Sequence, residues 1–192
     1  MSDERNRGIS RRRILSGALT LGVAVTGSRL AGAALVSGPK GADAVTIEAF
    51  APDGRSRGIG SVARVVKTDA EWRAQLSLLS WEVTRHDGTE PAFSGPYNSN
   101  HRDGLYACIC CGTMLFDSRT KFESGTGWPS FYRPISRYNV VERSDSSLGM
   151  QRIAVSCKRC DAHLGHVFDD GPRPTGLRYC MNSVALAFTP RT

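Results

Sequence analysis

The sequence contains no apolar run long enough to cross a bilayer. Its most hydrophobic stretch lies within residues 14–36, where Arg29 and several glycines interrupt it. The uninterrupted part falls short of the roughly 20 residues that a transmembrane helix needs. The sequence also has no internal repeat, and it has no low-complexity tract beyond this stretch. A retained membrane anchor at the N-terminus is therefore the weaker alternative to a removable signal.

Dense runs of Lys and Arg are absent after residue 44. Residues 1–44 contain seven Lys and Arg against three Asp and Glu, which leaves 18 against 15 for the remaining residues. Much of the formal net charge of +7 therefore belongs to the N-terminal segment. A weakly charged remainder of 148 residues suits one compact domain and gives no reason to expect a nucleic-acid partner.

The N-terminal segment resembles a twin-arginine export signal. Ser10-Arg11-Arg12-Arg13-Ile14-Leu15 precedes the Gly/Ala-rich apolar stretch. Ala42-Asp43-Ala44 then supplies the small-x-small pattern of a cleavage site. We expect residues 1–44 to be a signal segment and the mature chain to start near Val45. The expected location is periplasmic or extracytoplasmic, with tethering by an uncleaved leader as the alternative.

Six cysteines divide into two pairs and two single residues. Cys108 and Cys111 form one CxxC knuckle, and Cys157 and Cys160 form a second. Two such knuckles can surround one Zn²⁺ tetrahedrally at about 2.3 Å per Zn–S bond. The sequence therefore predicts one structural zinc ion that joins two distant parts of the domain. Disulfides across the knuckles and a redox-active CxxC pair are the alternatives.

The periodicity predicts a mainly β domain of antiparallel strands preceded by one helix. Thr68 to Glu71 form a capping box, which opens a helix that should run to about Leu79 with Trp72, Leu76 and Leu79 on one face. Residues 45–67 are expected to be a linker or a short added hairpin. The predicted strands span residues 105–107, 114–116, 138–142, 151–156, 166–168 and 179–188.

Three longer motifs carry a family resemblance. They are Gly125-Thr126-Gly127-Trp128-Pro129-Ser130-Phe131, His163-Leu164-Gly165-His166-Val167-Phe168 and Arg178-Tyr179-Cys180-Met181-Asn182-Ser183. Together with both knuckles and the segment His86 to Pro91, they resemble the methionine-R-sulfoxide reductases, the B-type family. The resemblance implies a catalytic domain over 68–192 with the family's two-sheet fold. It also implies reduction of methionine-R-sulfoxide, free or in proteins, with thioredoxin or another thiol as reductant, by a chain that is a monomer.

Cys180 is the candidate nucleophile. It lies outside both knuckles, and attack on a sulfoxide sulfur needs a soft thiolate whose pKa is lowered from about 8.5. Loss of the oxygen requires a proton, which imidazole can supply near neutral pH. By resemblance, His163 and His166 flank the oxygen with Asn182 nearby, and the sequence does not decide which histidine donates. A His-x-x-His metal pair is the alternative interpretation.

The resemblance also assigns Trp128 to the substrate methyl group and makes Phe168 and Tyr97 weaker candidates for the same wall. After transfer, Cys180 would be a sulfenic acid that a second thiol must reduce. Many family members carry a resolving cysteine where this sequence has Thr126. An external reductant, Cys110 or a knuckle thiol could then take that role, and Cys110 could also be a buried bystander.

Two other classes of function compete with reduction of a sulfoxide. A zinc-ribbon module that binds nucleic acid or protein would need only the knuckles, but Cys180, His163 and His166 lie outside them. A thiol-disulfide oxidoreductase would use one CxxC pair directly and hold no zinc. Metal analysis separates the second class from a structural zinc site.

Overall fold

The computed structural model describes residues 43–146 and 151–192. The predicted export signal falls on residues 1–44 and so lies almost wholly outside the described residues. Contacts divide the chain into residues 1–35 and 36–192, and the described helices and strands all belong to the second unit. Within the described ranges, none of the helices combines the length and the apolar character needed to span a membrane.

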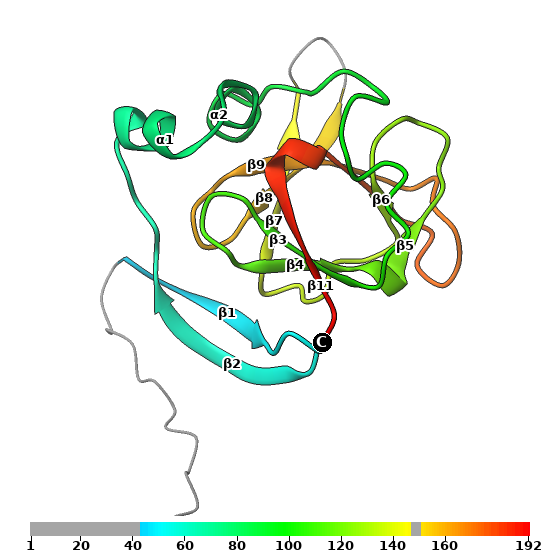
Figure 1. The fold of residues 1–192 in the computed structure, drawn as a ribbon, viewed down its shortest axis with the longest axis horizontal. Helices are drawn as coiled ribbons and strands as arrows, with labels where there is room; N and C mark the ends of the chain where they lie inside the picture. Colours follow the sequence, from blue (N-terminus) through cyan, green and yellow to red (C-terminus); the bar gives the residue numbers. More distant parts are fainter. Residues whose placement is uncertain (1–42, 147–150) are drawn as a thin grey trace, which may run out of the picture. The chain divides into compact units, whose positions relative to one another are not determined.

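The larger sheet has six antiparallel strands in the order β5-β6-β10-β9-β8-β7 (Figure 1). Every neighbouring pair in it is antiparallel, as the alternating pattern of the sequence predicts. The strands are β5 (Lys121–Phe122), β6 (Ser130–Phe131), β7 (Val140–Asp145), β8 (Arg152–Cys157), β9 (His163–Phe168) and β10 (Arg178–Met181).

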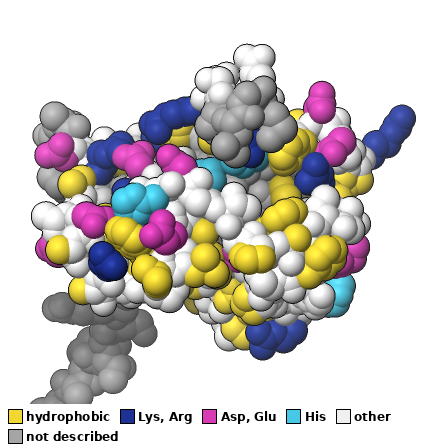
Figure 2. Space-filling view, turned by 90° about the horizontal axis from the view of Figure 1, so that it is seen from above, with side chains coloured by type: hydrophobic (Ala, Val, Ile, Leu, Met, Phe, Trp, Pro, Cys, Tyr) yellow, Lys and Arg dark blue, Asp and Glu magenta, His cyan; other side chains and the backbone are white. Residues whose placement is uncertain are grey.

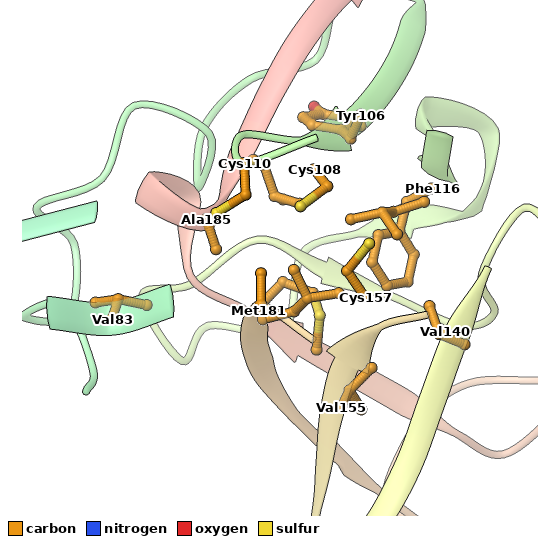
Figure 3. Packing of buried hydrophobic residues seen from close by; sticks show 14 of the residues in the cluster. Val83, Tyr106, Cys108, Cys110, Phe116, Val140, Val155, Cys157, Met181 and Ala185 are labelled. Atoms are coloured by element: carbon orange, nitrogen blue, oxygen red, sulfur yellow. The ribbon is translucent and has the colours of Figure 1, made fainter. Parts of the chain in front are cut away.

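The second sheet has three strands in the order β11-β3-β4, namely β3 (Gly104–Cys108), β4 (Met114–Asp117) and β11 (Leu186–Pro190). The hydrophobic core takes side chains from both sheets (Figure 3). Phe116 on β4 stacks on Phe131 of β6 with ring centroids 4.5 Å apart, and Tyr106 on β3 meets Phe131 edge-on at 5.1 Å. Burial of such aromatic surface is the main force that holds two sheets together. The prediction of a mainly β, antiparallel, two-sheet fold is confirmed.

The single leading helix predicted from Thr68 to Leu79 is wrong, because two short helices occupy this region. α1 (Asp69–Gln75) begins at the predicted capping box, in which Thr68 and Glu71 bond reciprocally. α2 (Leu78–Arg85) begins at Ser77, whose hydroxyl oxygen accepts the N–H of Ser80 at 3.1 Å. The extended backbone of Leu76 ends α1, and this second N-cap restarts the chain in a new direction. Leu79 is consequently 40% exposed and leaves the apolar face.

The single strand predicted over 179–188 is also wrong. β10 ends at Met181, a 3₁₀ turn η3 (Ser183–Ala185) follows, and β11 then joins the other sheet. The buried carboxylate of Glu90 accepts the backbone N–H groups of Ser183 at 2.7 Å and Val184 at 3.0 Å. These bonds satisfy backbone donors at the turn, and they let the chain leave one sheet for the other.

Other predicted strand boundaries shift by a few residues. β7 starts at Val140 rather than at 138, because Ser136 accepts the N–H groups of Tyr138 and Asn139 in a turn. β9 starts at His163 rather than at 166, so both candidate histidines lie on one strand. The two-residue strands β5 and β6 carry too few residues to show a period.

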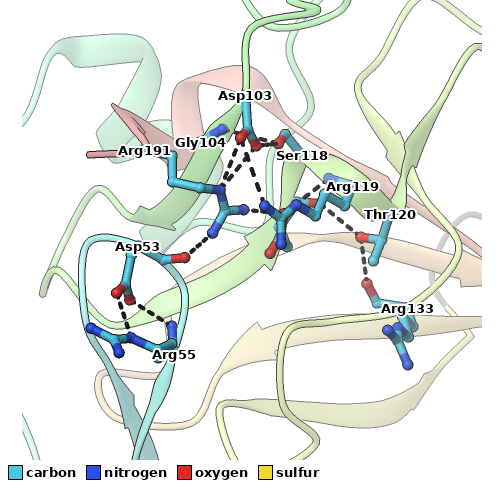
Figure 4. A network of polar contacts seen from close by, with 10 residues as sticks. Asp53, Arg55, Asp103, Gly104, Ser118, Arg119, Thr120, Arg133 and Arg191 are labelled. Carbon is cyan, nitrogen blue, oxygen red and sulfur yellow. Dashed lines mark hydrogen bonds and ion pairs between the residues drawn. The ribbon is translucent and has the colours of Figure 1, made fainter.

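A two-stranded hairpin precedes the helices. β1 (Ala44–Phe50) pairs with β2 (Ser56–Ala63). The side chain of Asn139 accepts the N–H of Glu48 at 2.8 Å and donates to its carbonyl at 2.9 Å, which imitates a neighbouring strand. Near the turn, Arg191 donates to the carbonyl of Asp53 and also pairs with Asp103 and Asp117 (Figure 4). The hairpin is thereby fixed to the two-sheet domain.

Candidate active site and zinc centre

The four knuckle cysteines meet at one point, as their spacing predicts. Their sulfur atoms all lie within 4.8 Å of one another. The sulfurs of Cys108 and Cys160 are 3.6 Å apart, and those of Cys111 and Cys157 are also 3.6 Å apart. A tetrahedron with Zn–S bonds of about 2.3 Å has edges of about 3.8 Å, so the donor set fits Zn²⁺. The chain has a structural zinc site.

Both knuckles have the same local geometry, which explains why the cysteines converge. The N–H of Gly112 bonds to the carbonyl of Cys108 at 2.8 Å, and the N–H of Asp161 bonds to the carbonyl of Cys157 at 2.9 Å. Gly112 and Asp161 both have positive φ, so each knuckle turns tightly enough to bring its two sulfurs together. The first knuckle joins β3 to β4 and the second joins β8 to β9. A zinc ion at this point cross-links the two sheets.

Cys110 lies in the protein interior beside the metal ligands. Its side chain is 4% exposed, and its sulfur lies 3.4 Å from the hydroxyl of Thr84 on α2. It belongs to the hydrophobic core cluster and is absent from the lining of both cavities described below. The structure therefore places it beside the zinc site, and access to it from solvent requires local opening.

Cys180 lines a small cavity on the outer face of the six-stranded sheet. The cavity has a volume of about 130 Å³. It is lined by the candidate nucleophile and other predicted site residues, together with residues that the sequence did not single out: Cys180, His166, Trp128, Asn182, Phe168, Met181, Gly165, Thr89 and Arg152. This volume suits a group the size of a methionine side chain, and the sulfur of Cys180 is at its wall.

The register of the sheet places Cys180 between a histidine and a serine. Cys180 on β10 is the direct cross-strand partner of His166 on β9, and it is also the partner of Ser130 on β6. Directly opposed residues share a face, with Cβ atoms about 4.5–5.5 Å apart. The strand pairing therefore places the candidate nucleophile next to the imidazole of His166.

The two candidate histidines lie in different environments. The rings of His163 and His166 are 5.2 Å apart. His166 Nε2 lies 2.8 Å from the Asp145 carboxylate, which can only accept a hydrogen bond. In the neutral ring Nε2 therefore carries the proton and Nδ1 is the acceptor. His163 is 2% exposed, and burial, with a smaller contribution from His166, lowers its pKa.

His163 lines a second, larger hollow that adjoins the first. This groove has a volume of about 620 Å³ and shares Thr89, Arg152 and His166 with the Cys180 cavity. Its other lining residues are mainly polar or charged, among them Arg143, Asp145 and Asp87. The structure thus brings His166 into contact with both spaces and His163 with the groove alone.

The carboxamide of Asn182 is engaged in bonds to the backbone. Its oxygen accepts the N–H of Glu90 at 2.9 Å, and its nitrogen donates to the carbonyl of Leu164 at 3.1 Å. Glu90 in turn holds the 3₁₀ turn that follows Asn182. Since the amide nitrogen has a second hydrogen, Asn182 can also donate toward the cavity that it lines.

Aromatic side chains form the apolar part of the cavity. Trp128 donates its indole N–H to the carbonyl of Glu90 at 3.0 Å, which fixes the plane of the ring. Phe168 is covered by the guanidinium of Arg178, 4.3 Å from the ring centroid. Tyr97 lies elsewhere, packed edge-on against Tyr106 in the core at 5.5 Å. Of the three aromatic candidates, two line the cavity and Tyr97 does not.

The surroundings of Cys180 affect the ionisation of its thiol in opposing directions. Burial raises its pKa, and this is opposed by hydrogen bonding to Thr126, by the charge of Arg178 and by Ser130. The sequence argument required a lowered pKa at this residue, whereas burial, the largest effect in the structure, raises this pKa. Burial disfavours the charged form of the thiol, so its ionisation depends on the neighbouring groups that oppose this effect.

Several residues around the cavity were not predicted. Arg152 bonds to Asp145 at 2.8 Å and lines both hollows, and Glu90 is only 1% exposed. Glu90 lies within the segment His86 to Pro91 that contributes to the family resemblance, but its carboxylate role has no signature in spacing. Arg152 and Asp145 lie on β8 and β7, where no motif marks them.

Comparisons with known proteins agree with this geometry. The SelR domain family model matches residues 76–190. A peptide methionine sulfoxide reductase MsrB of Pseudomonas putida (strain F1) is 58% identical over 128 residues, covering 67% of this chain and 98% of that protein. The protein of the same name in Pseudomonas entomophila (strain L48) is 59% identical over 128 residues, with the same coverage. That of Herminiimonas arsenicoxydans is 56% identical over 125 residues, covering 65% of this chain and 91% of that protein.

Fold, zinc centre and cysteine-histidine site define a zinc-containing thiol oxidoreductase. The length of the matches and their sequence identity assign the chain to one family within this class. The chain belongs to the SelR-domain family, that of the B-type methionine sulfoxide reductases, and the resemblance stated from its motifs is confirmed.

Proposed function

We propose that Cys180 is the nucleophile with which this chain reduces the R epimer of methionine sulfoxide to methionine. The chain is an oxidoreductase of the peptide-methionine (R)-S-oxide reductase class. The observation that carries the residue assignment is the pairing of Cys180 with His166 across β10 and β9, in a cavity that Trp128 also lines.

The reaction at Cys180 transfers one oxygen atom. The sulfur of Cys180 attacks the sulfoxide sulfur, and the S–O bond of the substrate breaks. The proton lost by the thiol balances the proton that the departing oxygen needs, so Cys–SH and R₂SO give Cys–SOH and R₂S. The cysteine is oxidised to sulfenic acid and the substrate is reduced to methionine. A path for that proton is therefore part of the site.

His166 is suited to carry this proton. It is the direct neighbour of Cys180, and the Asp145 carboxylate at 2.8 Å stabilises the ring when it becomes charged. His163 is less readily protonated, because burial lowers its pKa and favours the neutral ring, so less of it carries a proton to give. We assign proton transfer to His166 and a supporting position beside it to His163.

Trp128 and Phe168 supply an apolar wall for the substrate methyl group. Thioether sulfur and methyl groups pack favourably on aromatic rings. Since the indole of Trp128 is oriented by its bond to Glu90, a fixed wall can distinguish the two sulfoxide epimers by where the oxygen points. The adjoining polar groove leaves room for a polypeptide that carries the oxidised residue.

Recycling depends on an external thiol. Thr126 lies 3.8 Å from the sulfur of Cys180, so the position next to the nucleophile carries a hydroxyl and no thiol. Cys110 is buried against α2. An external thiol, such as a thioredoxin-like protein, attacks the sulfenic acid with loss of water, and a second thiol reduces the resulting mixed disulfide.

The zinc site stabilises the fold and takes no part in the oxygen transfer. When bound, Zn²⁺ supplies structural cross-linking and protects the thiolates of Cys108, Cys111, Cys157 and Cys160 from oxidation. A chain exported in folded form would carry the metal out of the reducing cytosol.

Residues 1–44 are proposed to direct export by the twin-arginine route to a periplasmic or extracytoplasmic location. The support is the Arg11-Arg12-Arg13 motif with the apolar stretch and Ala42-Asp43-Ala44 after it. Cleavage near Val45 would leave the hairpin almost complete, since β1 begins at Ala44. The catalytic domain is assigned to 68–192.

The chain is proposed to act as a monomer without a nucleic-acid partner. On the face shown in Figure 2, hydrophobic side chains are interspersed with polar and charged ones, as on monomeric proteins. The small excess of positive charge after residue 44 supports the absence of a nucleic-acid partner.

The nucleophile assignment is tested with the mature chain and its Cys180→Ser variant, each incubated with the R and S epimers separately and with dithiothreitol. The assignment predicts activity on the R epimer alone, and loss of this activity in the variant with the zinc content unchanged. Activity that survives the substitution, or that is confined to the S epimer, contradicts it.

A further inference from the structure

A chain of three hydroxyl groups ends at the sulfur of Cys180. The hydroxyl of Thr126 lies 3.8 Å from that sulfur and 2.8 Å from the hydroxyl of Ser124. Ser124 lies a further 2.8 Å from the hydroxyl of Ser130. Ser130 is completely buried and is the cross-strand partner of Cys180 on β6. These hydroxyls therefore surround the sulfur on the side opposite to His166.

The backbone fixes the direction of this chain. The hydroxyl of Ser130 can donate to the carbonyl of Trp128 at 3.2 Å, and its oxygen then accepts from Ser124 at 2.8 Å. The oxygen of Ser124 also accepts the backbone N–H of Thr126 at 3.4 Å. Each hydroxyl has only one hydrogen to give. In this arrangement, the hydroxyl of Thr126 is the member whose hydrogen can turn either to Ser124 or to Cys180.

This freedom matches the two states of the nucleophile. In the thiol state, the S–H of Cys180 can donate to Thr126, which donates onward to Ser124. When the sulfur loses its proton it can only accept, and rotation of the Thr126 hydroxyl then turns its hydrogen toward the negative charge. Hydrogen bonds to a charged acceptor are about twice as strong as bonds between neutral groups.

We infer that Thr126, held by Ser124 and Ser130, is the hydrogen-bond donor that stabilises the Cys180 thiolate during attack on the sulfoxide. The residue at the position of a resolving thiol would then act before oxygen transfer rather than after it. This inference rests on the proposed function of Cys180 as nucleophile and deepens it. It also agrees with the hydrogen bond to Thr126, which opposes the effect of burial on the pKa of Cys180.

Other groups around Cys180 also influence its ionisation and must stay unchanged in a test. Arg178 lies on the same strand, His166 lies on β9, and Arg152 on β8 lines the same cavity. Arg178 is itself held by Asp170 through two bonds of 2.8 Å. A variant of Thr126 leaves all these charges in place, so a change in ionisation reports the hydroxyl.

The test measures the rate at which iodoacetamide alkylates Cys180 as a function of pH, followed by mass spectrometry of the peptide that contains it. This readout needs no sulfoxide and no turnover, so it can fail while the assignment of Cys180 as nucleophile stands, and the reverse. Thr126→Val removes the hydroxyl at nearly constant volume. Thr126→Ser keeps it, and Thr126→Ala is the second removal if valine disturbs folding.

The inference predicts that Thr126→Val raises the apparent pKa of Cys180 by about one pH unit, which is about a tenfold loss of thiolate near neutral pH. Thr126→Ser should keep the wild-type profile. Thr120→Val, which removes the hydroxyl of a buried threonine that bonds to backbone carbonyls, is the control for loss of a threonine hydroxyl and should also leave the profile unchanged. An unchanged profile in both Thr126→Val and Thr126→Ala, or an equal shift in Thr126→Ser or Thr120→Val, overturns the inference.

Discussion

Cys180 and His166 are direct partners in the antiparallel ladder between β10 and β9. Their proximity is set by backbone hydrogen bonds and does not depend on a flexible loop. The bond from His166 to Asp145 at 2.8 Å fixes the ring from its far side. The proposed nucleophile, the proposed proton carrier and the carboxylate thus come from three strands of one sheet, β10, β9 and β7.

Replacement of His166 should slow oxygen transfer without unfolding the chain. We expect His166→Gln to lower kcat by a factor of about 10² to 10⁴, the usual contribution of a positioned acid or base. Steady-state assays with methionine-R-sulfoxide and dithiothreitol measure this. His101→Gln is the control, because the His101 side chain is 71% exposed and lines neither the Cys180 cavity nor the adjoining groove. Equal rates in His166→Gln and wild type would remove His166 from the mechanism.

The buried His163 should make the fold less stable in mild acid. Its folded pKa lies below the unfolded value of about 6.5, so the native state binds its proton less readily than the unfolded chain. The stabilisation is complete above that unfolded value and is lost as the pH falls through the lowered folded pKa.

Urea unfolding at pH 7.5 and pH 5.5 tests this prediction. Wild type should lose stability between the two, and His163→Gln should lose less, while His101→Gln should keep the wild-type difference. A pH dependence in His163→Gln as steep as that of wild type would show that His163 does not couple folding to protonation.

Removal of one zinc ligand should weaken the link between the two sheets. We expect Cys157→Ser to lose bound zinc and to lower the free energy of unfolding by several kcal/mol, out of the ~10 kcal/mol that a structural site can contribute. Metal analysis and thermal unfolding measure both effects. Cys110→Ser should retain one zinc per chain, since Cys110 contacts Thr84 and lies outside the ligand set. The reverse pattern would show that the ligand set is misassigned.

Cys110 should also be dispensable for recycling. Because it is 4% exposed and absent from the Cys180 cavity, we expect Cys110→Ser to turn over as wild type does with either thioredoxin or dithiothreitol. Parallel assays with the two reductants measure this. A loss confined to thioredoxin would identify Cys110 as the resolving thiol, and the external route would then be wrong.

The zinc ligands and the antiparallel sheets could be predicted from the sequence, because both depend on local residue spacing. The CxxC spacing predicted the zinc ligands, and alternation predicted the antiparallel sheets. The predicted helix continued past Ser77, but in the structure Ser77 is the N-cap of a second helix, α2. The predicted C-terminal strand continued past Ser183, but in the structure a turn begins there. The carboxylate of Glu90, 93 residues away in sequence, accepts the N–H of Ser183 and stabilises this turn.

The missed features share one physical cause. The roles of Glu90, Asp145 and Arg152 arise from tertiary contacts between strands distant in sequence, which no local period encodes. The direction of the pKa shift at Cys180 was likewise set by burial, and burial depends on the whole fold.

The central claim is that the oxygen of methionine-R-sulfoxide passes to the sulfur of Cys180. A single turnover without reductant, quenched with dimedone and analysed by peptide mass spectrometry, tests it directly. The account predicts one dimedone adduct, on Cys180, formed with the R epimer and absent with the S epimer. An adduct on Cys110 or on a knuckle cysteine, with Cys180 unmodified while methionine is formed, would contradict it.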